Sequence, residues 1–280
     1  MSSQLPGAAA QPTPAAPVES FPGLALLSML AVQTLVSMGA LAVPAIAPAV
    51  AAGTGLPLSA VGVFTGALYV GAMGSAIHIG GPLVRFGSMR TAQWCLGLCA
   101  FGLLLVASPW RALLLPGAVL VGIGYGSATP ASSHLFAYEV PRRWRGLVFS
   151  MKQTGVPLGG MLAGALLPAA DQRIGWHVAL PLLGGAGVLL ALGLQPLRAR
   201  FDRHREPGRS LASSGWLRTL RMVWGQPAVR ELAICTFFVA SMQASLATYL
   251  VAQAHAGAGL GPVQAGLLMA AAQAAGVVGR

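Results

Sequence analysis

Long uncharged stretches separated by short polar gaps set the pattern of the chain from residue 23 onward. A helix that spans a bilayer needs about 20 predominantly apolar residues. On that length, the pattern predicts an all-α polytopic membrane protein with seven spanning helices and the start of an eighth. The predicted spans are residues 23–50, 58–81, 91–108, 112–137, 146–169, 175–196 and 230–253, followed by a stretch that begins near Pro262.

The composition also indicates a membrane protein. Of the 280 residues, 55% are hydrophobic and only 8% are charged, whereas soluble domains carry about 25% charged residues. The formal net charge of +11 does not point to a nucleic-acid partner, because the basic residues lie in gaps between apolar stretches rather than on one accessible face. We therefore expect the lipid bilayer to surround most of this chain.

The arginines in the gaps predict how the chain is oriented. Thirteen lie in the gaps after the second, fourth and sixth spans, whereas only Arg111 and Arg173 lie in the opposite gaps. Basic residues accumulate in the cytoplasmic loops of membrane proteins. The pattern thus predicts a cytoplasmic N-terminus and a multi-pass protein of the plasma (inner) membrane.

The chain divides into four predicted regions. Residues 1–20 are rich in Pro, Ala and Ser and carry no basic residue, which is typical of a disordered cytoplasmic tail rather than a cleaved signal peptide. Residues 21–197 form a predicted N-terminal six-helix bundle, 198–228 a basic cytoplasmic loop, and 229–280 the start of a second bundle. Because the eighth stretch would stop at membrane depth on Arg280, we expect an incomplete chain.

A short motif after the second span carries a family resemblance. The segment GGPLVRFGSMR resembles the loop signature of the major facilitator superfamily, with Gly80 and Gly87 on its glycines and Arg85 and Arg90 on its basic positions. Six spans, a basic loop and then further spans are likewise similar to the plan of this superfamily. Val84 stands where the family carries an aspartate, so the loop lacks the carboxylate of a charge-locked gate.

A second motif, SMKQTGVPLGG, opens the fifth span. GVPLGG resembles a signature of exporters in the superfamily, and KQTGVPLGG is also similar to uptake-type members. Gly155, Gly159 and Gly160 provide small-residue stripes for close helix packing. Pro157 removes one backbone hydrogen bond and allows a bend. The motif predicts a helix that packs tightly and flexes.

Lys152 within this motif has two competing interpretations. At 100° per residue it shares a face with Gly159, which would direct it toward protein, and an ionisable residue inside a membrane segment is a functional hypothesis by default. The alternative is an interfacial anchor, because Arg145 is near and a lysine can extend its charge to the membrane surface. The sequence leaves both open.

Other polar side chains in the spans are candidates for a substrate cavity. The resemblance implies that the first, fourth and seventh spans line that cavity, although a hydrogen bond within its own helix is the simpler role for any single hydroxyl. The six acidic residues all fall in tails, loops or span ends, so no buried carboxylate is predicted. The cavity candidates, with Lys152, are Gln33, Tyr69, Tyr125, Gln153, Gln243 and Tyr249.

The resemblance implies a secondary active or facilitative carrier of a small solute that works by alternating access. Lys152 without a nearby acid favours a small organic anion as substrate, and protons are a candidate coupling ion. Two alternatives stay open: a drug or metabolite exporter of the same superfamily, and a truncated membrane protein that does not transport. The sequence carries no phosphate-binding loop, nucleophile–base set or metal cluster, so it predicts no enzyme, cofactor or metal site.

Overall fold

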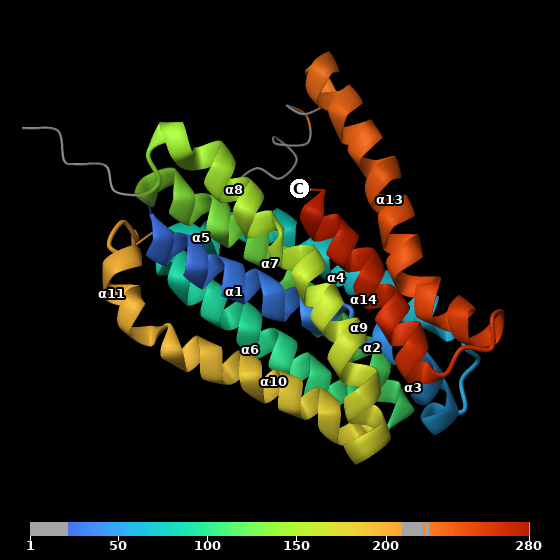
Figure 1. Ribbon diagram of the computed structural model, residues 1–280. Helices are drawn as coiled ribbons and strands as arrows, with labels where there is room; N and C mark the ends of the chain where they lie inside the picture. Colours follow the sequence, from blue (N-terminus) through green and yellow to red (C-terminus); the bar gives the residue numbers. More distant parts are fainter. Residues whose placement is uncertain (1–21, 209–220, 222–223, 280) are drawn as a thin grey trace, which may run out of the picture.

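The computed structural model describes residues 22–208, 221 and 224–279. Within them the chain forms α-helices joined by turns and short 3₁₀ segments, without a strand (Figure 1). The predicted tail at residues 1–20, and Arg209 and Arg218 of the predicted basic loop, lie outside the described residues. The helices are α1 (Gly23–Ala40), α2 (Ala42–Ala45), α3 (Ala47–Thr54), α4 (Ala60–His78), α5 (Gly80–Phe86), α6 (Ser88–Val106), α7 (Leu114–Glu139), α8 (Arg145–Gln153), α9 (Gly155–Ile174), α10 (Trp176–Gly193), α11 (Arg198–Phe201), α13 (Pro227–Ala256) and α14 (Pro262–Val278).

Six helical segments among the described residues are long and apolar enough to cross a membrane. The α14 helix is apolar but shorter, at 17 residues. The predicted all-α polytopic architecture is therefore confirmed. The six segments are Gly23–Ala40, Ala60–His78, Ser88–Val106, Arg111–Glu139, Trp176–Phe201 and Pro227–Ala256.

Two of the predicted spans are interrupted rather than continuous. The first is divided into α1, α2 and α3, with breaks shortly before Pro44 and Pro48. The fifth is divided into α8 and α9 at Thr154, three residues before Pro157. A proline cannot donate the backbone hydrogen bond to the residue four positions earlier, which weakens the helix at that turn. The spans predicted over 23–50 and 146–169 are therefore each divided among shorter helices.

Close backbone contacts hold α7 at the centre of the helices that precede α11. The α7 helix packs between α4 and α6. A Cβ on Gly122 would overlap the carbonyl oxygen of Leu68 in α4, and one on Gly117 would lie 2.8 Å from the carbonyl oxygen of Gly102 in α6. Glycines at these positions let the helix backbones approach. Around this centre α1 packs against α7 and α9, α10 against α6, and α14 against α9.

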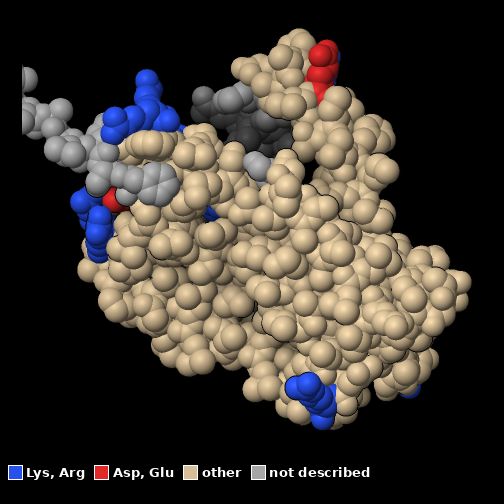
Figure 2. All heavy atoms as spheres, viewed as in Figure 1, with Lys and Arg blue, Asp and Glu red and all other residues tan. Residues whose placement is uncertain are grey.

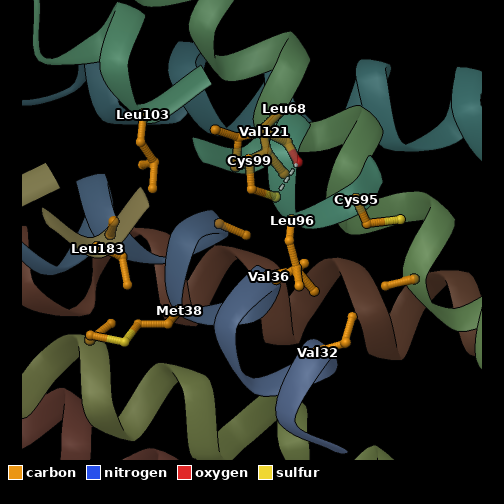
Figure 3. Packing of buried hydrophobic residues seen from close by; sticks show 14 of the residues in the cluster. Val32, Val36, Met38, Leu68, Cys95, Leu96, Cys99, Leu103, Val121 and Leu183 are labelled. Atoms are coloured by element: carbon orange, nitrogen blue, oxygen red, sulfur yellow. Dashed lines mark hydrogen bonds between the residues drawn. The ribbon is translucent and has the colours of Figure 1, made fainter. Parts of the chain in front are cut away.

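The apolar core lies where α1, α6, α7 and α10 meet (Figure 3). Cys99 belongs to it, and its thiol donates a hydrogen bond of 3.5 Å to the carbonyl oxygen of Val121. Cys95 is buried beside it, whereas Cys235 is exposed on α13. The core residues labelled in the close-up are Val32, Val36, Met38, Leu68, Cys95, Leu96, Cys99, Leu103, Val121 and Leu183.

Basic side chains gather at one end of the molecule. Figure 2 shows them over the region of α8 and α11, with isolated blue groups at the opposite end. We call the first end the α11 end. The α13 helix, orange in Figure 1, extends away from the other helices and packs against α14. The helices therefore present apolar sides between one strongly basic end and one weakly charged end.

Candidate functional site

The Lys152 side chain lies inside the bundle. It belongs to the last turn of α8 and is 0% exposed to solvent. Its Nζ donates hydrogen bonds to Thr129 Oγ1 at 3.1 Å and to Gln153 Oε1 at 3.0 Å. The ammonium group also lies 6.0 Å from the centre of the Phe149 ring. The side chain does not extend to the polar end of the helices, so the interfacial-anchor alternative does not describe this structure.

A chain of hydrogen bonds leads from Lys152 into α1. Thr129 in α7 accepts from the lysine and donates its own proton to Gln33 Oε1 at 3.3 Å. The amide of Gln33 then donates to Ser37 Oγ at 3.1 Å. Thr129 and Gln33 each accept one hydrogen bond and donate another, so α8, α7 and α1 are linked through one polar network. Gln33 is 1% exposed, while Thr129 and Gln153 are half-buried and form the edge of the network.

The charge of Lys152 has no acidic partner among the described residues. Acidic side chains at the α11 end pair with arginines instead, Asp202 with Arg198 and Glu139 with Arg203. Burying an ammonium group without a counter-charge is costly, and neutral hydrogen bonds offset only part of the cost. An ionisable side chain kept at that cost within a membrane segment is typical of a binding or transport role.

Two tyrosines lie near the polar network, Tyr125 on α7 and Tyr69 on α4. Tyr125 precedes Thr129 by one helical turn and is half-buried. Its ring lies 6.4 Å from the ring of Tyr69 in α4, in an edge-to-face arrangement. Tyr69 is 38% exposed. The structure thus places Gln33, Tyr125, Lys152 and Gln153 in one region, with Tyr69 at its margin.

The candidates on α13 are not part of this region. Gln243 is exposed on that helix. Tyr249 is 38% exposed, and its hydroxyl lies directly against Gly62 near the beginning of α4. The α8 helix that carries Lys152 lies toward the α11 end, whereas the beginning of α4 is at the opposite end (Figure 1). Neither residue contacts the Lys152 network.

The glycines after Lys152 fall on two sides of α9. A Cβ on Gly155 would lie 3.0 Å from Gln33 Cβ, and one on Gly159 would overlap the carbonyl oxygen of Thr34, so both glycines face α1. A Cβ on Gly160 would lie 2.7 Å from Gln273 Nε2, so this glycine faces α14. Pro157 is buried between these contacts. The α9 helix therefore contacts both neighbours through main-chain surface.

The loop motif contains one tight turn, at Gly87. Gly80 lies within the short helix α5, where a Cβ would meet no atom within 4 Å. Gly87 has φ +92°, and a Cβ there would overlap the Asp202 carboxylate. The guanidinium groups of Arg85 and Arg90 lie 5.4 Å and 5.9 Å from the rings of Phe86 and Trp94. Most of the motif is therefore helical: residues 80–86 form α5, and α6 begins directly after Gly87.

A buried carboxylate reaches this motif from α11, contrary to the sequence-based expectation. Asp202 is 4% exposed and accepts hydrogen bonds from the backbone N–H groups of Met89 at 2.8 Å and Arg90 at 3.1 Å. Burial raises the pKa of Asp202 above its ordinary value, while these two N–H groups and the guanidinium of Arg198 oppose the shift. Asp202 therefore caps the beginning of α6, a role that its position 113 residues away did not suggest.

The fold defines a polytopic α-helical membrane protein. The chain belongs to the Major Facilitator Superfamily, whose family model matches residues 26–280. Membership of this family confirms the resemblance seen in the sequence. It also confirms that the chain is a multi-pass membrane protein of a transporter family rather than an enzyme.

Curated relatives match part of the chain. The probable anion transporter 5 of rice (Oryza sativa subsp. japonica), a chloroplastic protein, is 29% identical over 42% of this chain and 26% of its own length. The 4-hydroxybenzoate transporter PcaK of Acinetobacter baylyi is 32% identical over 52% of this chain and 32% of its own length. The probable plastidic glucose transporter 1 of Arabidopsis thaliana is 30% identical over 48% of this chain and 25% of its own length.

Solved structures share the fold. A bacterial homolog of the human lysosomal transporter Spinster, in an inward-facing and occupied conformation, superposes with a TM-score of 0.65 at 18% sequence identity. Its inward-facing, unoccupied form superposes with a TM-score of 0.60. The matches cover 91% and 92% of this chain but only 59% and 60% of those chains. The chain thus spans about three fifths of these structures, and its matches cover about a quarter to a third of each curated relative.

Proposed function

We propose that this protein carries a small organic anion across a membrane by alternating access, with Lys152 as the counter-charge of the substrate. The observation that carries the proposal is the burial of Lys152 in a network of neutral groups, without a carboxylate among the described residues. A site of this kind has an unbalanced positive charge, which an anionic ligand would neutralise.

The hydrogen bonds around Lys152 leave room for such a ligand. A lysine ammonium has three donors, and Thr129 and Gln153 accept from two of them. The third can donate to a substrate oxygen. Both partners are half-buried, so an anion that reaches them from the α7 side would meet the lysine through the edge of the network. In this proposal Tyr125, one turn before Thr129 on α7, contacts the rest of the substrate.

The names of the relatives and the buried lysine together favour an anion rather than a sugar as the substrate. Two of the three curated relatives are named as transporters of an anion or of 4-hydroxybenzoate, and the third as a glucose transporter. A sugar is recognised through neutral hydrogen-bonding groups and does not need a buried cation. The lysine therefore favours the carboxylate class, and protons are proposed only as a candidate coupling ion.

The close contacts of α9 support a rocking movement. Gly155 and Gly159 bring α9 against α1, and Gly160 brings it against α14. We propose that these contacts, with Pro157, let α14 move relative to the first six predicted spans. We also propose that residues 21–197 and 229–280 belong to the two bundles, and that the basic α11 end faces the cytoplasm with the N-terminus. Labelling of single cysteines by an impermeant reagent in intact cells would test that orientation.

Uptake by the Lys152→Met, Lys152→Ala and Lys152→Arg variants tests the function. We expect the methionine and alanine variants to lose about 10- to 100-fold in kcat/KM for aromatic and aliphatic carboxylates, since a hydrogen bond to a charged group contributes about 1.5–3 kcal/mol. The arginine variant should keep part of the activity because it keeps the charge. Arg142→Gln, an exposed basic residue near the same end, is the matched control.

Two outcomes would reject the proposal. Near-normal carboxylate uptake by all three Lys152 variants would exclude the lysine as the counter-charge. Uptake of neutral sugars but of no carboxylate by the unmodified protein would exclude the substrate class.

A further inference from the structure

Two adjoining cavities lie at the end of the bundle opposite the α11 end. The larger has a volume of about 410 Å³ and lies between α2, α3, α4 and the beginning of α7. The smaller, of about 120 Å³, lies between the end of α3, the connection before α7 and the beginning of α10. Thr54, Arg111 and Leu114 line both cavities, so the two are neighbours across one wall. Neither cavity includes a residue of the Lys152 network.

The larger cavity suits an apolar chain. Apart from Thr54 and Arg111, its lining consists of aliphatic and aromatic side chains and proline. The Thr54 hydroxyl already donates to the carbonyl oxygen of Val50 at 2.6 Å, so it offers no donor to a ligand. The lining residues Val63 and Leu115 are 62% and 47% exposed, which places the mouth of the cavity on the apolar side of the helices. A volume of about 410 Å³ falls within the usual range of small-molecule sites.

The smaller cavity suits an anionic group. Ser108 Oγ is buried there and has no hydrogen-bond partner, a state that is costly unless a ligand completes it. His177 also lines the cavity; its Nδ1 is 2.6 Å from the carbonyl oxygen of Ala107, which leaves Nε2 as the other polar atom of the ring. Asp171 lies near His177 and accepts the backbone N–H of Trp176. The Asp171 carboxylate is therefore hydrogen-bonded to the first residue of α10.

Arg111 joins the two cavities. A Cβ on Gly55, which has φ +66°, would lie 3.1 Å from Arg111 Nη2, so the guanidinium group lies over the turn after α3. Among the described residues no carboxylate forms an ion pair with it. The chain thus places an unpaired guanidinium and an unpaired hydroxyl next to a deep apolar cavity, at the level where helix ends meet lipid headgroups.

We propose that these cavities form one binding site for a fatty acid drawn from the bilayer. The carboxylate lies in the smaller cavity, where Arg111 and Ser108 donate hydrogen bonds to it, and the hydrocarbon chain lies in the larger cavity. A ligand in this position contacts α3, α4, α7 and α10 at once, so it stabilises the packing of these helices at this end. The site is separate from the proposed transport site and does not depend on it.

A photoreactive fatty acid tests the proposal. The protein, purified at its native length and placed in nanodiscs of zwitterionic lipid, is labelled with a diazirine analogue of palmitic acid, and the labelled peptides are identified by mass spectrometry. We expect labelling within residues 43–64 and 111–115 that excess palmitate suppresses. Arg111→Gln should weaken binding at least about tenfold. Ala51→Phe, which fills the larger cavity, should weaken it while keeping the charge.

The controls separate a specific site from bulk lipid and from a small-anion site. Arg173→Gln, in the last turn of α9, leaves the cavity linings intact and should bind normally. Equal competition by palmitate and by palmityl alcohol would overturn the proposal in favour of a groove for any acyl chain. Competition by acetate or inorganic phosphate alone would overturn it in favour of a small-anion site. Unchanged labelling in both the Arg111 and Ala51 variants would also overturn it.

Discussion

Replacement of Asp202 tests whether the carboxylate directly after α11 holds the beginning of α6. Asp202 accepts the backbone N–H groups of Met89 at 2.8 Å and Arg90 at 3.1 Å. The N–H groups of a first helical turn have no partner within the helix. Asp202→Ala removes both acceptors, whereas Asp202→Asn keeps one carbonyl oxygen and replaces the other oxygen with an NH₂ group.

The magnitudes follow from these two bonds. Loss of a capping side chain costs about 0.5–2 kcal/mol, and the site is buried, so water does not replace the acceptor easily. We expect a loss of about 2 kcal/mol of unfolding free energy for Asp202→Ala. We expect about 1 kcal/mol for Asp202→Asn, which can keep the shorter bond from Met89 but offers a donor to Arg90. Because burial raises the pKa of Asp202, loss of the charge itself should add little.

Thermal unfolding of the purified protein in one detergent measures both effects. For a chain of this size 1 kcal/mol corresponds to about 2–4 °C, so Tm should fall by about 4–8 °C for Asp202→Ala and by about half of that for Asp202→Asn. Glu231→Ala, an exposed acid near the beginning of α13, is the control. An unchanged Tm for Asp202→Ala would refute the cap. Equal losses for both variants would show that charge, rather than acceptor geometry, is what matters.

The remaining predictions concern α7. Gly122→Val should lower the unfolding free energy by about 1–3 kcal/mol, because its side chain would overlap the carbonyl oxygen of Leu68. Gly97→Val, at a position where a Cβ would meet no atom within 4 Å, is the control, and equal thermal stability of the two would contradict the close contact. Thr129→Val should weaken carboxylate transport and Thr129→Ser should largely preserve it, because only the serine variant keeps an acceptor for Lys152. Uptake kinetics decide this, and equal kinetics of the two variants would remove Thr129 from the network.

The spanning helices could be predicted from the sequence, but the positions of their breaks could not. A bilayer requires long apolar helices, so that requirement is visible in a single sequence. A proline, in contrast, has no fixed consequence. Helices are interrupted shortly before Pro44, Pro48, Pro82 and Pro157, whereas Pro130, Pro168 and Pro181 lie within continuous helices. Which outcome occurs depends on how neighbouring helices satisfy the freed carbonyl group.

The sequence was enough to single out the charged residue of the candidate site, Lys152, but not the residues that contact it. Lys152 stood out because an ionisable residue near an apolar stretch is costly. Its contact with Thr129 depends on how α7 is rotated against α8, which glycine contacts with other helices determine. Asp202 could not be found because an acid in a basic loop is usually solvated, and no local pattern links it to Met89. Gln243 and Tyr249 were chosen by span number, and the structure places both away from Lys152.

The two glycine-lined sides of α9 also restrict how this segment can change during evolution. Gly155 and Gly159 face α1, while Gly160 and Gly164 face α14. Inserting or deleting one residue after Thr154 rotates every later position by about 100°. That rotation would turn larger side chains toward both neighbours at once, and no shift of a single helix could relieve the two overlaps together. We therefore expect homologues to vary in side chain along α9 but to keep its length from Thr154 to Gly164 unchanged.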